Sequence, residues 1–169
     1  MAVGLFSGCA ERTTTKSAYQ MVMPASAERY ELDESQQFML GERIGSAVLP
    51  EYPAAEIHRR LPEQIVCVEI DIGEDGRVFA SRPLHDAAGC PAENAQPDPV
   101  FYTAAEHAVA QWAFEPARLC TFPPGVPKND ECQGTGVKME NVPIRLAFLF
   151  SFTLEHGPRV TGRALEGGK

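Results

Sequence analysis

The stretch that decides the fold covers residues 64–84 and reads QIVCVEIDI, GEDG and RVFASRPL in succession. Apolar and polar residues alternate along its first part, and the apolar set shares one face: Val66, Val68, Ile70 and Ile72. Such alternation is typical of a β-strand with one buried face. Gly73 and Gly76 bracket two acidic residues, a pattern typical of a tight hairpin turn. The stretch therefore predicts a β-hairpin whose apolar face the rest of the chain must cover.

Two helices are predicted to supply part of that cover. Prolines hold the backbone extended around Tyr52, and Pro53 suits the first position of a short helix over residues 54–61. Asp98, followed by a proline, suits the start of a second helix over residues 100–113. This second helix carries one apolar stripe at helical spacing: Phe101, Ala105, Ala108 and Trp112.

The last regular element is predicted over residues 144–154, where apolar residues alternate most strongly: Ile144, Leu146, Phe148, Phe150, Phe152 and Leu154. A hairpin, one crossing helix and a strand make this last strand antiparallel to the first strand of the hairpin. The sequence thus predicts an α+β two-layer fold, a three-stranded antiparallel sheet in the order 2-1-3 with two helices on one face. The last strand is then an edge, and an open edge permits dimerisation.

The chain divides into three predicted regions. Residues 1–29 form a lipobox-like start and flexible tether, residues 30–156 form the domain, and residues 157–169 form a frayed tail. Two segments of the domain are less regular. Residues 34–40 suit either a helix capped by Asp33 or, over residues 37–40, a short strand. Residues 118–141 predict an irregular insertion before the last strand.

Charge and hydropathy exclude several classes of partner. The net charge is −8 and the isoelectric point is near 5.0, whereas nucleic acids and anionic membrane surfaces are bound by basic faces. No apolar run approaches the roughly 20 residues that span a bilayer. A protein partner is therefore expected.

Four cysteines within the domain predict two disulfides. No CxxC pair and no zinc-type His/Cys spacing is present, and disulfides persist in oxidising compartments. Of the three possible pairings, Cys120–Cys132 is favoured because the loop between them is short and rich in Pro and Gly. Cys67–Cys90 follows by elimination. The alternative is a cytosolic protein with four reduced thiols.

The fifth cysteine, Cys9, lies in the sequence LFSGCA (residues 5–10), which resembles the lipobox of bacterial lipoproteins. In that reading Cys9 carries a lipid. Only eight residues precede it, whereas a secretory signal contains an apolar core of about 7–15 residues after a charged start. The alternative is an ordinary apolar N-terminus with a free or buried cysteine.

Four motifs in succession resemble the C-terminal domain of the TonB energy-transducer family. They are a Tyr-Pro motif at residues 50–55, an Ile-Asp-x4-Gly-x-Val motif at residues 70–78, a Trp-x-Phe-x-Pro-Ala motif ending at residue 117, and the Phe-rich last strand. The resemblance covers about residues 49–154. It implies a periplasmic module with two helices on a three-stranded sheet.

The same resemblance implies how a partner binds. In the family, an extended segment of an outer-membrane receptor pairs with the edge of the last strand, which is β-augmentation. The implied partner-binding residues are Tyr52, Pro53, Arg145, Ala147, Leu149, Ser151 and Thr153. The alternative role for Tyr52 is packing at a helix entrance. Because the family's transmembrane helix and Pro-rich spacer are absent, an accessory or scaffold role in the envelope is expected, with or without a lipid anchor in the outer membrane.

Two further classes compete with this interpretation. One is a structural subunit of a larger cell-envelope complex that uses the same edge. The other is an enzyme, for which His85, Asp86 and Cys90 are the nearest candidates. The four histidines are scattered and match no metal or nucleophile motif. No catalytic residue, metal or cofactor is therefore expected.

Overall fold

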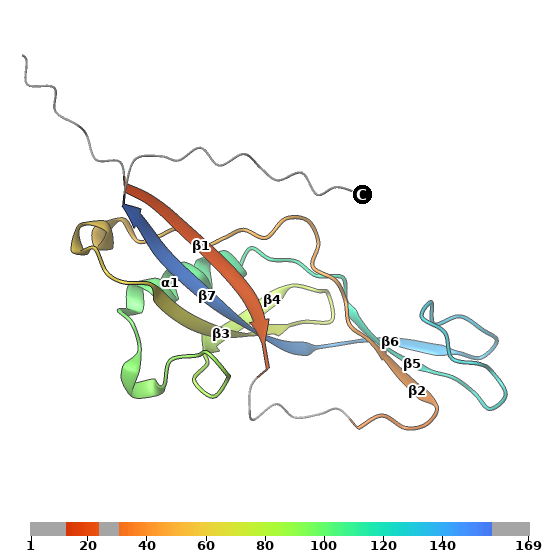
Figure 1. Cartoon of the computed structure of the whole chain (residues 1–169). Helices are drawn as coiled ribbons and strands as arrows, with labels where there is room; N and C mark the ends of the chain where they lie inside the picture. The colour runs from red at the N-terminus through yellow and green to blue at the C-terminus, as the bar shows by residue number, and fades with distance from the viewer. Residues whose placement is uncertain (1–12, 24–30, 157–169) are drawn as a thin grey trace, which may run out of the picture.

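Two antiparallel β-sheets make up most of the chain in the computed structural model, which describes residues 13–23 and 31–156 (Figure 1). The strands are β1 (Thr13–Val22), β2 (Gln36–Met39), β3 (Gln64–Ile72), β4 (Val78–Pro83), β5 (Ala117–Thr121), β6 (Lys138–Val142) and β7 (Ile144–His156). The helices are the 3₁₀ segments η1 (Ala54–Arg59) and η2 (Glu93–Ala95) and the α-helix α1 (Pro99–Val109). The larger sheet has the order β1-β7-β3-β4, and the smaller sheet has the order β2-β5-β6.

The predicted hairpin is confirmed as β3 and β4, which pair antiparallel. Gly76 sits in its turn at φ +77°, and a Cβ there would lie 1.9 Å from the carbonyl oxygen of Phe114. Only glycine fits this close approach without strain. The ladder shifts register between Asp71 and Ile72, and the bulge leaves Phe79 68% exposed at the outer side of β4.

One face of the larger sheet carries the core. The side chain of Asp98 accepts a hydrogen bond from the backbone N–H of Val100, which caps α1 as predicted. Buried residues of β3, β7 and α1 meet there with Tyr52 and two aromatic residues after α1: Tyr52, Val66, Val68, Ile70, Ile72, Phe101, Ala105, Val109, Trp112, Phe114, Phe148, Phe150 and Phe152. Ile57 of η1 packs against this cluster. The predicted coverage of this face by two helical segments is observed, although η1 is 3₁₀ and α1 ends four residues early.

The predicted fold class is wrong in its sheets. Residues 13–22, within the predicted tether, form β1 and pair with β7 over their whole length, from Thr13 opposite His156 to Val22 opposite Ala147. The last strand is therefore not an edge, because it lies between β1 and β3. The predicted neighbours β7-β3-β4 are present, but a fourth strand follows them. Backbone N–H and C=O groups form the ladder, so a strand can add where its side chains give no apolar signal.

The second correction concerns residues 118–141, predicted to be irregular. They contain most of β5 and β6, and β5 pairs with β2, so the strand alternative for residues 37–40 is confirmed in place of the helix. This smaller sheet projects to one side of the larger one (Figure 1). We call the smaller sheet and its connecting loop, residues 122–137, the arm.

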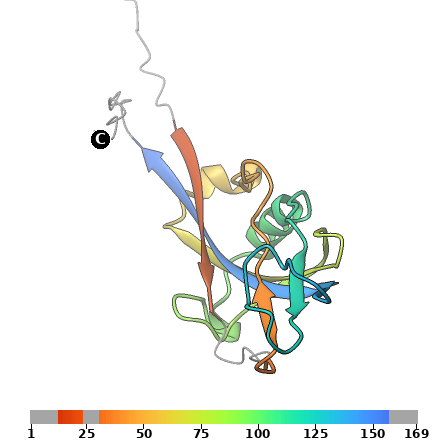
Figure 2. The ribbon, with the colours of Figure 1, turned by 90° about the vertical axis from the view of Figure 1, so that its right-hand side faces the viewer.

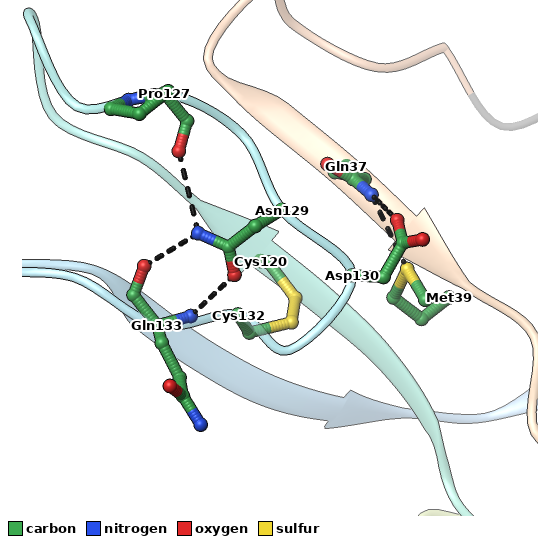
Figure 3. The surroundings of a disulfide bond; sticks show 8 residues. All are labelled: Gln37, Met39, Cys120, Pro127, Asn129, Asp130, Cys132 and Gln133. Carbon is green, nitrogen blue, oxygen red and sulfur yellow. Dashed lines mark hydrogen bonds between the residues drawn. A yellow bond between two sulfur atoms is a disulfide. The ribbon is translucent and has the colours of Figure 1, made fainter.

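The loop of the arm is fastened by a disulfide and by amide side chains (Figure 3). The Asn129 side chain accepts a hydrogen bond from the backbone N–H of Gln133 and donates one to the Gln133 carbonyl oxygen. Gln37 on β2 donates to Asp130 at 2.8 Å. These contacts fasten the loop to itself and to β2.

Both predicted disulfides are confirmed. Cys67 pairs with Cys90 across a Cα–Cα distance of 5.7 Å, and Cys120 pairs with Cys132 across 5.6 Å. Disulfides of this kind belong to oxidising, extracytoplasmic compartments. In the described ranges, no helix has the length and apolar character needed to span a membrane.

Candidate functional site

The outer edge of β1 is the longest free sheet edge in the described part of the chain. β1 has ten residues, pairs on one side with β7, and no described strand pairs with its other side. Figure 1 shows this strand on the outer side of β7, and Figure 2 shows the two strands crossing in a second view. Unpaired N–H and C=O groups along such an edge are a ready template for another strand.

The other three sheet edges are less suited to pairing. β2 and β6 have four and five residues. β4 has six residues, carries the bulge at Phe79 and ends at Pro83. Short strands, bulges and prolines are the usual protections of a sheet edge. β1 has no glycine, proline or bulge in its ten residues, so it lacks these protections.

One aromatic side chain anchors β1 to the core. The Tyr19 ring lies 5.1 Å from the Trp112 ring and 6.1 Å from the Phe148 ring, measured between centroids. Arg43 donates a hydrogen bond to the Tyr19 hydroxyl oxygen at 3.2 Å and stacks over Trp112. No β1 residue is itself buried. The strand is therefore held by its ladder, by Tyr19 and by a hydrogen bond from Ser17 Oγ to the carbonyl oxygen of Pro50, 2.7 Å long.

A groove with a volume of about 390 Å³ lies beside β1. β1 supplies one wall, and the turn before η1 together with η1 supplies the other: Thr15, Lys16, Ser17, Pro50, Glu51, Tyr52 and Ile57. Thr15 and Ser17 share a strand face with Tyr19, because side chains alternate along a strand. The groove therefore opens on the helix-covered face, next to the N-terminal half of the β1 edge.

Tyr52 lies where the groove meets the core. It lines the groove, but its side chain is buried against Phe101, with centroids 5.3 Å apart, and against Phe152. Burial raises the pKa of its hydroxyl, and the nearby Glu56 carboxylate raises it further. The hydroxyl has no hydrogen-bond partner among the described residues. Pro53 is half-buried and precedes η1 as its N-cap residue, so the Tyr-Pro turn positions the groove wall.

The five predicted partner-binding residues of β7 share the opposite face of the sheet. They are Arg145, Ala147, Leu149, Ser151 and Thr153. β1 lies between the last four and the free edge, whereas Arg145 precedes the part of β7 that pairs with β1. Ala147 is buried and Leu149 is half-buried, because the loop tied down by Cys67–Cys90 packs over them. A Cβ on Gly89 of that loop would lie 3.1 Å from Leu149 Cδ1. The residues from Ala147 to Thr153 are therefore not brought to an open edge.

A charged cluster occupies the same opposite face. Arg82 of β4 contacts Glu69 at 2.6 Å and Asp71 at 2.7 Å, and Arg145 of β7 contacts Asp71 at 2.8 Å. The hydrogen bond from Arg82, helped by Arg145, lowers the pKa of Asp71. The same carboxylate raises the pKa of Arg82. The cluster ties three neighbouring strands together, which explains why charged residues stand in the middle of this sheet.

Replacing Asp71 with asparagine is expected to lower the free energy of unfolding at pH 7 by roughly 1.5–3 kcal/mol, the usual range for hydrogen bonds to a charged group. Since the folded pKa of Asp71 is lowered, the stabilisation is present above the unfolded pKa of about 3.9 and is lost as pH falls through the folded value. Urea unfolding at pH 7 and pH 3 measures this. The difference between D71N and wild type should shrink at pH 3, whereas exposed Glu140→Gln should have little effect at either pH. A gap that stays constant with pH would contradict the role given to the Asp71 charge.

The residues named for the enzyme alternative lie in the loop after β4. His85 Nδ1 lies 2.9 Å from the Gln96 amide nitrogen, and Cys90 is disulfide-bonded rather than a free thiol. Residues 13–23 and 31–156 contain no cluster of three or more metal-binding side chains. Cys9 lies outside the described residues.

β1 is the element of the candidate site that sequence reasoning missed. Its sequence TTTKSAYQMV has no glycine or proline and begins with three β-branched threonines, which is a signal for strand structure. The lack of a buried face hides that signal, because apolar alternation is the main indicator of a strand.

No protein-family model matches the chain, and no curated protein matches it in sequence.

Proposed function

We propose that this protein is a protein-binding module of an oxidising extracytoplasmic compartment, and that it takes up an extended segment of a partner by strand addition at the outer edge of β1. The observation that carries the proposal is the ten-residue edge without proline, glycine or bulge, with a groove beside residues 15–17. This is the arrangement that β-augmentation uses, because backbone hydrogen bonds supply affinity and side-chain pockets supply selectivity.

The groove favours a segment with a defined side-chain pattern. A strand added to β1 places alternate side chains on the helix-covered face, beside Thr15 and Ser17. The groove offers both apolar and charged walls, with Ile57 on one side and Lys16 and Glu51 nearby. A partner segment with a medium-sized side chain at one position facing this groove is therefore expected.

The resemblance to the TonB C-terminal domain supports the same class of function with a different docking strand. β1 of the chain itself pairs with β7 from Ala147 to His156, so the proposal moves the docking edge outward by one strand. We further propose a periplasmic location, with a lipid on Cys9 holding the protein to the outer membrane. The partner would then be an outer-membrane receptor or another component of the cell envelope.

Paired proline substitutions test the docking edge. N–H groups of successive strand residues point to opposite sides, so Thr15→Pro and Lys16→Pro differ in which side loses its donor. One of them removes a donor to β7, and the other removes a donor to the free edge. Ten-residue peptides selected from a displayed library for binding to the full chain supply the ligand.

The variant that keeps the β1–β7 ladder is expected to bind the selected peptides at least about tenfold more weakly, since one lost docking hydrogen bond of roughly 1.4 kcal/mol corresponds to that factor. Amide hydrogen exchange of β7 identifies which variant keeps the ladder, and fluorescence anisotropy measures binding. If both variants bind like the wild type, or if the peptides protect the arm instead of β1, the proposed site is wrong.

A further inference from the structure

We infer that one partner for the β1 edge is the same edge of a second copy of this chain, so that two four-stranded sheets join across a two-fold axis into one continuous sheet. This inference rests on the proposed function, because both use the same edge. It adds an identified partner and a specific register.

Symmetry restricts the possible registers. Two copies of one strand pair antiparallel when the two-fold axis is perpendicular to the sheet, and this axis keeps the helix-covered faces of both copies on the same side. Opposed residues must then share a face, so both have odd numbers or both have even numbers. In β1 the odd-numbered Tyr19 faces the core and the even-numbered Gln20 faces away, opposite Leu149.

Charge and contacts select among these registers. Lys16 is the only charged residue of β1, and a two-fold axis at Lys16 would oppose two like charges, which is destabilising. Ser17 donates a hydrogen bond to the Pro50 carbonyl oxygen. An axis at Ser17 would therefore bring the Pro50 segments of the two copies toward each other. An axis at Ala18 avoids both problems and places the smallest side chain of the strand at the centre. Lys16 then faces the second copy's Gln20.

The Ala18 register also joins an exposed apolar side chain to the groove. Met21 is 55% exposed on the helix-covered face, and in this register it lies opposite Thr15 of the other copy. Thr15 lines the groove between β1 and the Pro50–Tyr52 turn. Each copy therefore offers one medium-sized apolar side chain and one groove to receive it, which gives a self-complementary contact of the kind a two-fold interface needs.

The charge of the chain predicts how the affinity of this dimer depends on salt concentration. Each copy carries a net charge of −8, so the copies repel at long range, whereas β1 itself contains no carboxylate. Added salt screens the repulsion beyond about 8–10 Å and leaves the ladder intact. The dimer is therefore expected to become tighter as salt rises from 20 to about 150 mM, opposite to an association held by ion pairs.

Single cysteines test the register in the full chain, with Cys9→Ser in every variant. Opposed residues have Cβ atoms about 4.5–5.5 Å apart, so Ala18→Cys is expected to form a disulfide-linked dimer at least tenfold faster than Lys16→Cys, which faces Gln20 instead of itself. Equal rates for the two variants would overturn the register. Sedimentation equilibrium over a range of protein and salt concentrations measures association without cross-linking.

A matched pair of methionine variants tests the groove contact. Met21→Ala is expected to weaken dimerisation about tenfold, while Met139→Ala on β6 leaves it unchanged, since both side chains are about equally exposed, at 55% and 53%. A chain that stays monomeric at every concentration overturns this inference. If that monomer binds the selected peptides and a proline in β1 weakens this binding, the proposed function stands. If the chain neither dimerises nor binds the peptides, the dimer and the proposed function are both wrong.

Discussion

Replacing Trp112 with alanine is expected to lower the free energy of unfolding by about 3–5 kcal/mol, the range for a large buried aromatic residue. Trp112 is 4% exposed, and its ring lies within 6.5 Å of four other aromatic rings. Its indole N–H donates to the carbonyl oxygen of Val48 at 2.9 Å, so the substitution also leaves an acceptor unpaired. Urea unfolding followed by circular dichroism measures the loss.

The same substitution should also loosen β1. Because Tyr19 rests on Trp112, the W112A variant should show faster amide exchange along β1 than along β3. Phe122→Ala is the matched control, since Phe122 is equally buried but lies in the arm cluster with the Cys120–Cys132 disulfide. It should cost stability without changing exchange in β1. Unchanged exchange of β1 in W112A would contradict the anchoring role given to Tyr19 and Trp112.

Removing the Cys67–Cys90 disulfide by a double alanine substitution is expected to cost about 3.5 kcal/mol. The two cysteines are 23 residues apart, and the chain-entropy estimate for a loop of that length gives this value. The cost should be local as well as global. Cys67 and Cys90 pack with Leu84, Ala147 and other apolar residues, so releasing the loop opens a small apolar cluster to water.

Urea unfolding and exchange of the loop over residues 85–97 measure this prediction. The double alanine variant at Cys120 and Cys132 is the comparison, because its shorter separation of 12 residues predicts a smaller cost of about 3 kcal/mol, centred on the arm. A loss below about 1 kcal/mol at Cys67–Cys90, with the loop still protected, would show that packing alone holds the loop on the sheet.

The parts of the fold with local signals could be predicted from the sequence. Alternation around Ile70 and the two turn glycines define the β3–β4 hairpin, and Asp98 caps α1 through its own side chain. The disulfide pairing was predictable because a short Pro/Gly loop brings Cys120 near Cys132. Each of these depends on residues close together in the chain.

The edges of the sheet could not be predicted, because pairing between distant segments depends on backbone groups that every residue has. β1 is exposed on both faces apart from Tyr19 and a few half-buried residues, so no period-two pattern marks it. β5 and β6 are short and lie in a segment full of turn residues. The docking edge was therefore predicted on β7, whereas β1 of the same chain pairs with β7 from Ala147 to His156.

The pairing of Thr13 with His156 places the start of β1 and the end of β7 side by side, at one end of the ladder between these strands (Figure 1). A mechanical load applied between these two ends would act across the ladder in a peeling geometry, since antiparallel hydrogen bonds run perpendicular to the strands. The bonds would then fail one pair at a time rather than together. Tension between the two termini would thus strip β1 away and uncover β7 at low force, while the cross-linked core beyond it stays folded.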